Sequence, residues 1–466
     1  MLFNSFEFLL FFPLVFILHW FVFNNGKSSQ NLFLIIASYF FYSCWDWRFS
    51  FLLGFSTILD YYSGLVISNS NDLKTKRNWM RLSIFINLGI LCYFKYTNFF
   101  IDSFIHLFNS IGFHCDPFTL NIIIPIGISF YTFHGISYVL DNYYGRIKAT
   151  TNLVEYSLFV SFFPLLVAGP IERATHLLPQ LSRKRKFSYV QSIEGCRLIL
   201  WGMFKKVVIA DSLSPIVEDI FTNYQNHNGI TLIIGVISFA FQVYGDFSGY
   251  TDIARGISKL LGIELILNFN FPYFSRSIPE FWSRWHISLS SWLNDYVFTP
   301  LALKFRHHEK YGIFIAIFIT FLISGFWHGA GLHFIAWGGY YGLLYIPYIF
   351  SKKGIKSIVS KKSDPLKASD LPKIILTFSL VCLGYVFFRS PELSHSFRFL
   401  DHLISDCSLS QKVAYKSFLI YPLLILLADL IRFKSNFLDS IPVYILIVLM
   451  ILHHSTNQSN FIYFKF

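Results

Sequence analysis

Long apolar runs follow one another through most of this 466-residue chain. The first extends from Phe6 to Phe23, and two clear later runs cover residues 229–262 and 311–327. A helix needs about 20 mostly apolar residues to cross the hydrocarbon core of a bilayer. Only 14% of the residues are charged, whereas soluble domains carry about 25%. The sequence therefore predicts an all-α polytopic membrane protein and excludes a soluble enzyme, a disordered chain and a secreted disulfide scaffold.

One span with its loop takes roughly 30 to 35 residues, so the chain has room for about a dozen spans. The first run begins with Glu7 rather than a basic residue and no small-residue cleavage site follows, so we interpret it as a retained span and not as a signal peptide. Further runs, some of them short or broken, lie at about 31–45, 47–67, 82–105, 121–140, 153–169, 194–211, 331–350, 372–389, 414–432 and 441–454.

The chain has a net charge of +12, and its Lys and Arg residues are concentrated in short segments between the apolar runs. The clearest are Arg183–Lys186, Lys304–Lys310 and Lys352–Lys373. Cytoplasmic loops of membrane proteins are enriched in Lys and Arg, so we assign all three segments to the cytoplasm and expect no nucleic-acid partner. The six cysteines lie far apart without a CxxC pair, which suggests neither a metal site nor a disulfide framework.

Two of the broken apolar runs stand out. One is interrupted by Pro125 and Gly127, and the other contains Pro164 and leads to Gly169-Pro170. A broken helix in a membrane must have its freed backbone groups buried in protein or facing water. Each break therefore indicates either the wall of a cavity or a kinked structural helix.

The stretch from Gln242 to Trp292 differs in composition from the rest. Ionisable residues stand there among aromatic and aliphatic ones: Asp246, Asp252, Arg255, Lys259, Glu264, Arg276, Glu280, Arg284 and His286. Such residues in a membrane protein usually face a partner or a water-filled cavity. We expect Asp246 and Asp252 to hold helices together.

Ser277 and Glu280 form a capping-box pattern with Pro279 in the first turn. It predicts a helix from about Ile278 after a loop or re-entrant segment over 268–277. One face of that helix would carry Trp282, Trp285, His286, Leu289 and Leu293. The same pattern is also typical of an interfacial helix on the membrane surface.

A second local pattern predicts a helical hairpin. The apolar run from Tyr311 to Trp327 leads through His328-Gly329-Ala330-Gly331 into another run that ends at Phe350. Forty residues are twice what one crossing needs, so His328 would lie near the apex with both ends of the hairpin in the cytoplasm. A neutral imidazole there is a candidate general base. We find no GxSxG, P-loop, HExxH or GxGxxG pattern.

The chain resembles the membrane-bound O-acyltransferase (MBOAT) family, in particular its bacterial alginate O-acetyltransferase branch. The matching segments are MLFNSFEFLLFFPLVF at the start, IPIGISFYTFHGISYVLDNYYG (124–145), FFPLLVAGPIERA (162–174), FKKVVIADSL (204–213), YGDFSGYTDIARG and its continuation through RWHISLSSWLNDYVFTPL (244–301), SGFWHGAGLHFIAWGGYYGLL (324–344) and the closing FIYFKF (461–466). Relatives commonly have a Gly-Gly turn after DYVFTPL, where this chain has Ala302-Leu303-Lys304-Phe305. That departure leaves the shape of the loop, and any donor contact in it, open.

The resemblance implies one membrane domain over 1–466 with a catalytic core at about 120–350. It implies a ring of about 11 or more helices with broken segments around a central tunnel. Family members of this branch transfer acetyl groups across the bacterial inner membrane towards an exopolysaccharide, often with a periplasmic partner acetyltransferase. We expect acetyl-CoA or another acyl thioester as donor substrate, with no bound cofactor or metal.

The resemblance also implies roles for individual residues. The family's embedded histidine matches His328, which would be the base, and its second histidine matches His286, which would orient the acceptor or assist proton transfer. Arg284 would contact the donor or the oxyanion. The residues expected to line the tunnel are Trp285, Trp292, Asn294 and Trp327.

Two other readings stay open. One is transfer of D-alanine to teichoic acid from a carrier protein. The other is a proton-coupled transporter in which the two histidines and the Asp residues form a relay. The absence of an inverted repeat and the concentration of charge in one central stretch argue against the transporter.

Overall fold

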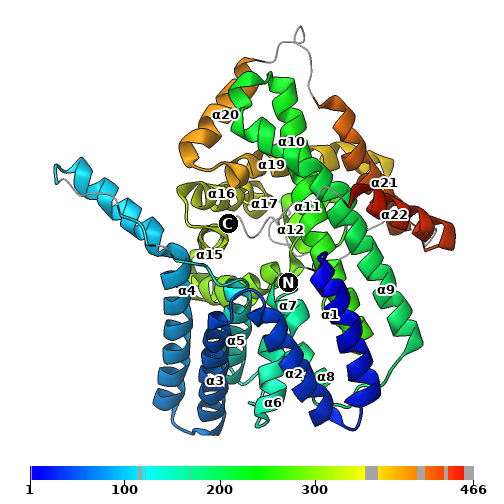
Figure 1. Cartoon of the computed structure of the whole chain (residues 1–466). Coiled ribbons are helices and arrows are strands. Elements are labelled where there is room, and N and C mark those ends of the chain that lie inside the picture. Colours follow the sequence, from blue (N-terminus) through cyan, green and yellow to red (C-terminus); the bar gives the residue numbers. More distant parts are fainter. Residues whose placement is uncertain are drawn as a thin grey trace. The chain divides into compact units, whose positions relative to one another are not determined.

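The computed structural model describes residues 1, 3–113, 118–120, 122–167, 169–351, 366–406, 415–434 and 439–455. Every regular element within these ranges is a helix (Figure 1), which confirms the all-α prediction. Helices long and apolar enough to cross a membrane are Arg48–Asn69, Leu73–Ser110, Gly229–Leu260, Arg306–His328 and Ala368–Arg389. Shorter apolar helices cover Phe6–Val22 and Ile441–His454. The ring around a tunnel stays a prediction.

The chain divides into two compact units. Unit 1 comprises residues 1–199 and 250–266, and unit 2 comprises residues 200–249 and 267–466. Helix α11 (Gly229–Leu260) contributes residues to both. The single domain inferred from the sequence stays a prediction, and each unit is described by itself. The segment 352–365, which contains most of one basic loop, and the closing residues 461–466 lie outside the described ranges.

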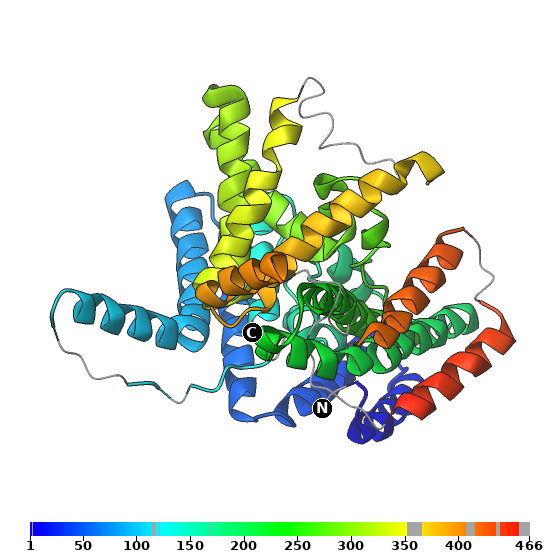
Figure 2. The ribbon, with the colours of Figure 1, turned by 90° about the horizontal axis from the view of Figure 1, so that it is seen from above.

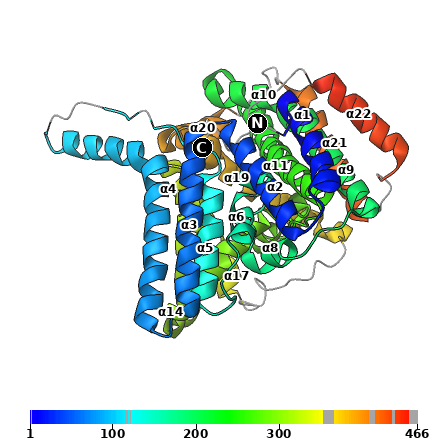
Figure 3. The same ribbon diagram turned by 60° about the horizontal axis from the view of Figure 1, so that its bottom comes forward.

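Unit 1 is built from helices that mostly follow the apolar runs. They are α1 (Phe6–Ile17), η1 (Leu18–Val22), α2 (Lys27–Ser43), α3 (Arg48–Asn69), α4 (Leu73–Ser110), α5 (Ile128–Tyr143), α6 (Leu153–Ser161), α7 (Phe163–Leu166), α8 (Ala174–Leu181) and most of α9 (Tyr189–Met203). Helices α3, α4 and α5 pack side by side (Figure 3). The later, cyan part of α4 extends away from α3 and α5 (Figure 2).

A buried carboxylate fastens α3 to α4. Asp60 accepts hydrogen bonds from Ser83 Oγ at 2.6 Å and from Asn87 Nδ2 at 2.8 Å. A buried polar group is tolerated when such partners satisfy it. On the α5 side Gly135 faces Asp60 so closely that any Cβ there would collide with its carboxylate. Polar contacts thus join α3 to α4, and the absence of a side chain at Gly135 lets α5 pack against the same carboxylate.

Both breaks expected from the sequence occur in unit 1. Helix α5 starts only at Ile128, after Gly127 with φ 75°, a left-handed conformation that favours glycine. A Cβ at Gly127 would also collide with the carbonyl of Leu166 in α7. Helix α6 ends at Ser161, and Pro164 stands in the short helix α7 that follows. The breaks therefore let two backbones approach each other closely.

Unit 2 contains the central and C-terminal helices. They are η2 (Phe204–Ala210), α10 (Asp211–Thr222), η3 (Tyr224–Asn226), the first part of α11, η4 (Pro272–Phe274), α12 (Ile278–Arg284), α13 (Ile287–Leu293), η5 (Asn294–Phe298), α14 (Thr299–Lys304), η6 (Arg306–His308), α15 (Glu309–His328), α16 (Leu332–Leu344), α17 (Ile346–Phe350), η7 (Ala368–Asp370), α19 (Leu371–Arg389), α20 (Leu393–Ser405), η8 (Lys416–Leu419), α21 (Ile420–Lys434) and α22 (Ile441–His454). Of Ala302-Leu303-Lys304-Phe305, whose loop shape the sequence left open, the first three residues belong to α14 and Phe305 is its C-cap.

Helices α15 and α16 form the predicted hairpin (Figure 1). A Cβ at Gly338 would collide with the carbonyl of Phe321, and one at Gly325 would collide with the carbonyl of Phe334. The two helices therefore touch backbone to backbone, as small residues allow in membrane bundles. This contact fixes His328, the last residue of α15, against the start of α16.

A buried ion cluster joins η2 to α11 and α10. Lys206 Nζ lies 2.8 Å from a carboxylate oxygen of Asp211 and 2.8 Å from one of Asp246. All three side chains are buried. Asp246 thus ties two elements, as expected, whereas Asp252 pairs with Arg255 one turn further along the same helix.

We predict that Lys206→Met lowers the free energy of unfolding by about 3–5 kcal/mol, because two buried carboxylates would lose their cation. The control is Lys259→Met, whose partners Glu194 and Glu264 are exposed and which should cost about 1 kcal/mol or less. Thermal and denaturant unfolding in detergent measure both. Equal small losses would show that the carboxylates of Asp211 and Asp246 do not depend on Lys206.

Candidate active site

Helix α12 begins where the sequence predicts. Ser277 is its N-cap, and the Ser277 hydroxyl accepts a hydrogen bond from the Glu280 backbone N–H at 3.3 Å. The return bond expected of a capping box is displaced by one residue. Glu280 Oε2 accepts from the backbone N–H of Arg276, at 2.9 Å, rather than from that of Ser277. The cap therefore fixes the start of the helix and also holds the residue before it.

The prediction of one continuous helix through His286 is wrong. Helix α12 ends at Arg284 and α13 starts at Ile287. At the junction His286 has φ 43° and ψ 53°, a left-handed conformation that is uncommon outside glycine. The face that was expected to carry Trp285 and His286 together with Leu289 is therefore divided between two short helices.

Backbone pairing with residues 268–270 explains the break. Asn270 N donates to Arg284 O, and Ile287 N donates to Asn268 O, each at 2.9 Å. These bonds replace those that a continuous helix would make within itself. Buried backbone groups must find a partner somewhere, and here an extended segment supplies it.

The side chain of Asn268 anchors the imidazole of His286. Asn268 Oδ1 lies 3.2 Å from His286 Nδ1 and accepts hydrogen bonds from the Ser288 backbone N–H at 3.1 Å and the Ser288 hydroxyl at 2.9 Å. The Ser288 N–H can only donate, so the Asn268 atom facing it is the oxygen. Because this oxygen can only accept, His286 Nδ1 must be the donor, and a neutral His286 therefore carries its proton on Nδ1.

The other ring nitrogen of His286 is left available. His286 Nε2 is buried and has no hydrogen-bond partner within the part of the chain that the structure describes. Phe247 meets the ring edge-on, with centroids 4.7 Å apart. Burial lowers the pKa of His286, which lies outside the candidate spans, to about 3. The imidazole is therefore neutral, with an acceptor lone pair on Nε2.

His328 lies in an aromatic cage. Its ring centroid is 4.7 Å from that of Trp327, 5.0 Å from that of Trp337 in α16 and 5.2 Å from that of Phe388 in α19. The centroid of Trp327 is in turn 6.3 Å from that of His286. The structure therefore brings the two candidate histidines to the same indole ring.

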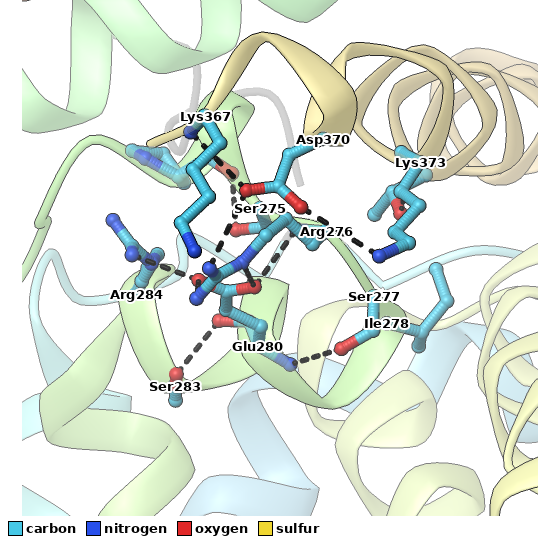
Figure 4. Close-up of polar contacts among 12 residues, drawn as sticks. Ser275, Arg276, Ser277, Ile278, Glu280, Ser283, Arg284, Lys367, Asp370 and Lys373 are labelled. Carbon is cyan, nitrogen blue, oxygen red and sulfur yellow. Dashed lines mark hydrogen bonds and ion pairs between the residues drawn. The ribbon is translucent and has the colours of Figure 1, made fainter. Parts of the chain in front are cut away.

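Arg284 takes part in a chain of charges rather than standing alone (Figure 4). Its Nη2 donates to Glu280 Oε1 at 2.8 Å, and Arg276 Nε donates to Glu280 Oε2 at 3.1 Å. Arg276 also lies 3.7 Å from Asp370, which pairs with Lys373 at 3.6 Å. Burial alone would raise the pKa of Glu280, but hydrogen bonds from Arg276 lower it overall. An ionised Glu280 thus orients the guanidinium of Arg284, a residue that is only 4% exposed.

The remaining predicted site residues lie in different surroundings. Trp285 is buried and stacks on Phe281, with centroids 5.6 Å apart. Trp292 is buried in α13 and packs against Tyr296. Asn294 is exposed at the start of the π-helix η5 and donates to the neighbouring Asp295. Among the site residues predicted from the sequence, aromatic ring contacts in the described part of the chain therefore join His286 and His328 to Trp327.

Sequence reasoning missed Asn268, Trp337 and Phe388. Asn268 is distant from His286 in sequence and carries no motif of its own. The one available signal was its position in a stretch without helical period, where a buried polar side chain often satisfies the backbone. Trp337 and Phe388 look like ordinary apolar helix residues, and only the packing of α16 and α19 shows that they enclose His328.

The comparisons with known proteins identify the family of the chain. The model of the MBOAT, membrane-bound O-acyltransferase family, matches residues 144–365, which include both histidines. The chain is 38% identical to the probable alginate O-acetylase AlgI of Pseudomonas aeruginosa, over 87% of this chain and 75% of that one. It is 33% identical to the peptidoglycan O-acetyltransferase of Helicobacter pylori, over 82% and 76% of the two chains. It is 28% identical to the teichoic acid D-alanyltransferase of Bacillus subtilis, over 59% and 71%.

We predict that Asn268→Ala slows acyl transfer by about tenfold to a hundredfold, because His286 loses the acceptor that sets its tautomer and orientation. Asn223→Ala is the matched control, since that amide is exposed and bonds to Asp219 on the same helix end, and it should keep its rate. Turnover by the purified, folded variants measures both. A wild-type rate for Asn268→Ala would show that this hydrogen bond does not serve the reaction.

Proposed function

The chain belongs to the membrane-bound O-acyltransferase family and is a multi-pass membrane acyltransferase, and we propose that it acetylates hydroxyls of a polysaccharide such as alginate. The donor is acetyl-CoA or another cytoplasmic acyl thioester. The acetyl group crosses the bacterial inner membrane to the acceptor, directly or through a periplasmic acetyltransferase. The observation that carries the proposal is the meeting of His286 and His328 at Trp327.

Acyl transfer to a hydroxyl needs a base, and we assign that role to His328. The hydroxyl oxygen attacks the thioester carbonyl carbon while its proton passes to the imidazole. When the carbon–sulfur bond breaks, the same proton can go to the departing thiolate. The rings of Trp327, Trp337 and Phe388 around His328 support this role, because they keep out water that would otherwise hydrolyse the thioester.

We assign His286 to positioning the acceptor. Its Nδ1 is held by Asn268, so Nε2 can accept a hydrogen bond from a second hydroxyl of the same sugar. The left-handed backbone at His286 supports a functional role, since such strain persists where the surrounding structure enforces it. Arg284, oriented by Glu280, is the proposed contact for the donor or for the oxyanion. In the same proposal Trp285, Trp292 and Asn294 line a tunnel within a ring of about 11 helices.

A second candidate function is transfer of D-alanine to teichoic acid. The match to the Bacillus subtilis D-alanyltransferase favours it. Both reactions need a base, a desolvated thioester and a hydroxyl acceptor. They differ in the donor, which is a carrier protein in the second case. Label transfer from acetyl-CoA to alginate oligosaccharides in proteoliposomes tests the first function, and failure with acetyl-CoA but success with a D-alanyl thioester would establish the second.

We predict that His328→Ala lowers kcat by about 10² to 10⁴, whereas His286→Gln mainly raises the KM for the acceptor. The control is His333→Gln. His333 is a further buried histidine, which lies in α16, and its replacement should leave both kcat and KM unchanged. Steady-state kinetics with varied acceptor measure the difference. A loss of kcat without a change of KM in His286→Gln would mean that the two histidines have exchanged roles.

We also predict opposite accessibility at the two ends of α15. Twenty residues of helix extend about 30 Å, the thickness of the hydrocarbon core. In a cysteine-free background, Lys304→Cys should react only with reagents that enter the cytoplasm, and Leu332→Cys only from outside. Both side chains are exposed in the structure. Labelling of Lys304→Cys in intact cells by an impermeant reagent would overturn the proposed direction of transfer.

A further inference from the structure

A basic segment of unit 1 lies between α8 and α9 and contains one inward-facing residue. Arg183, Lys184 and Lys186 are exposed, but Arg185 is only 5% exposed. Basic residues on a loop normally remain in solvent. The burial of Arg185 therefore requires a cause in the structure and a partner for its charge.

Two side chains of α2 fix the backbone of this segment. Gln30 Nε2 donates to Arg185 O at 3.1 Å, and Arg185 N donates to Gln30 Oε1 at 2.9 Å. Asn31 Nδ2 donates to Leu181 O at 2.9 Å. Gln30 and Asn31 are themselves fully buried. The inward position of Arg185 is therefore built into the fold and is not a chance orientation of a surface side chain.

The guanidinium of Arg185 has no anionic partner there. Its Nε, Nη1 and Nη2 are buried without a hydrogen bond to any residue that the structure describes. A buried unpaired charge is strongly unfavourable.

The neighbour that Arg185 does have cannot neutralise it. His19 is fully buried and close enough to Arg185 to interact with it electrostatically, but it carries no negative charge. No ion pair of Arg185 with an acid occurs in the described part of the chain, and three acids of unit 1 pair with other bases, Glu155 with Lys27 and both Glu194 and Glu264 with Lys259. The compensating anion must therefore come from outside the described chain.

The residues around Arg185 are of the kinds that occur at the headgroup level of a membrane. His19 and Trp20 stand in η1, the last turns of the apolar helix Phe6–Val22. Trp20 donates its indole N–H to Leu260 O at 2.9 Å, and Trp residues are enriched at the membrane interface. Beyond η1 the chain becomes polar through Asn24 and Lys27. Along the helix, Leu14 and Phe21 are exposed apolar side chains that would face acyl chains.

We propose that Arg185 binds the phosphate of an anionic phospholipid whose acyl chains lie along the exposed face of α1 and η1. The planar guanidinium can donate two parallel hydrogen bonds to phosphate oxygens. The exposed Arg183, Lys184 and Lys186 add a positive potential that attracts anionic headgroups, as basic pockets beside membrane helices do. A free inorganic phosphate would offer the same oxygens but not the apolar chains.

The test uses the full-length protein in detergent, with Arg185→Gln compared to Arg183→Gln. Phosphatidylglycerol should raise the thermal midpoint of the wild type more than phosphatidylcholine does. Arg185→Gln should weaken phosphatidylglycerol binding, titrated by native mass spectrometry, by at least about tenfold. Its midpoint without lipid should not fall, because an uncompensated charge has been removed. Arg183→Gln, an exposed change in the same segment, should bind within about twofold of the wild type.

Two results would overturn the proposal. One is wild-type phosphatidylglycerol affinity in Arg185→Gln. The other is stabilisation by inorganic phosphate with no added effect of phosphatidylglycerol over phosphatidylcholine, which would assign the site to free phosphate. Should Arg185→Gln fail to fold, Arg185→Lys keeps the charge but not the two parallel donors. Reduced affinity in that variant supports the proposal, and unchanged affinity contradicts it.

Discussion

Every backbone polar group that leaves water needs a partner, and this requirement shapes both the helices and their interruptions. A membrane chain satisfies it most easily as continuous helix. Where α12 and α13 separate, residues 268–270 supply the missing bonds to Arg284 and Ile287. Asn268 adds its side-chain oxygen and so satisfies Ser288 and His286 together. The same bonds that permit the break therefore orient the imidazole, which couples the stability of the fold to the geometry of the site.

The two histidines reach Trp327 by different physical means. His328 stands at the end of a regular helix, and the close glycine contacts of α15 with α16 set where that end lies. His286 stands at a left-handed residue between two short helices, and its ring is set by one hydrogen bond. An orientation set by backbone packing changes little when a polar side chain is replaced. An orientation set by a single buried acceptor depends on that acceptor, so the two positions should respond differently to changes around them.

Local patterns in the sequence predict the parts of this arrangement that depend on neighbours along the chain. The Ser277 cap, the interruptions at Gly127 and Pro164, and the hairpin that ends α15 at His328 all follow from short-range rules. The break at Trp285–His286 does not follow from such rules. Those residues are typical of a continuous helix, and the break is caused by hydrogen bonds with residues 268–270. Asn268, Phe388 and the inward turn of Arg185 likewise depend on contacts between distant segments. The family resemblance supplied the two histidines but neither the amide nor the aromatic cage that holds them.

The basic side chains buried in this protein are compensated to different degrees, and these differences indicate their functions. Lys206 lies between Asp211 and Asp246 and is compensated within the protein, so it serves structure. Arg284 and Arg276 share Glu280, which orients both guanidinium groups. Arg185 has its backbone held by Gln30 but faces no acid. Because the fold fixes the charge of Arg185 without neutralising it, a ligand must supply the negative charge. At the end of an apolar helix, the available anion is a lipid phosphate.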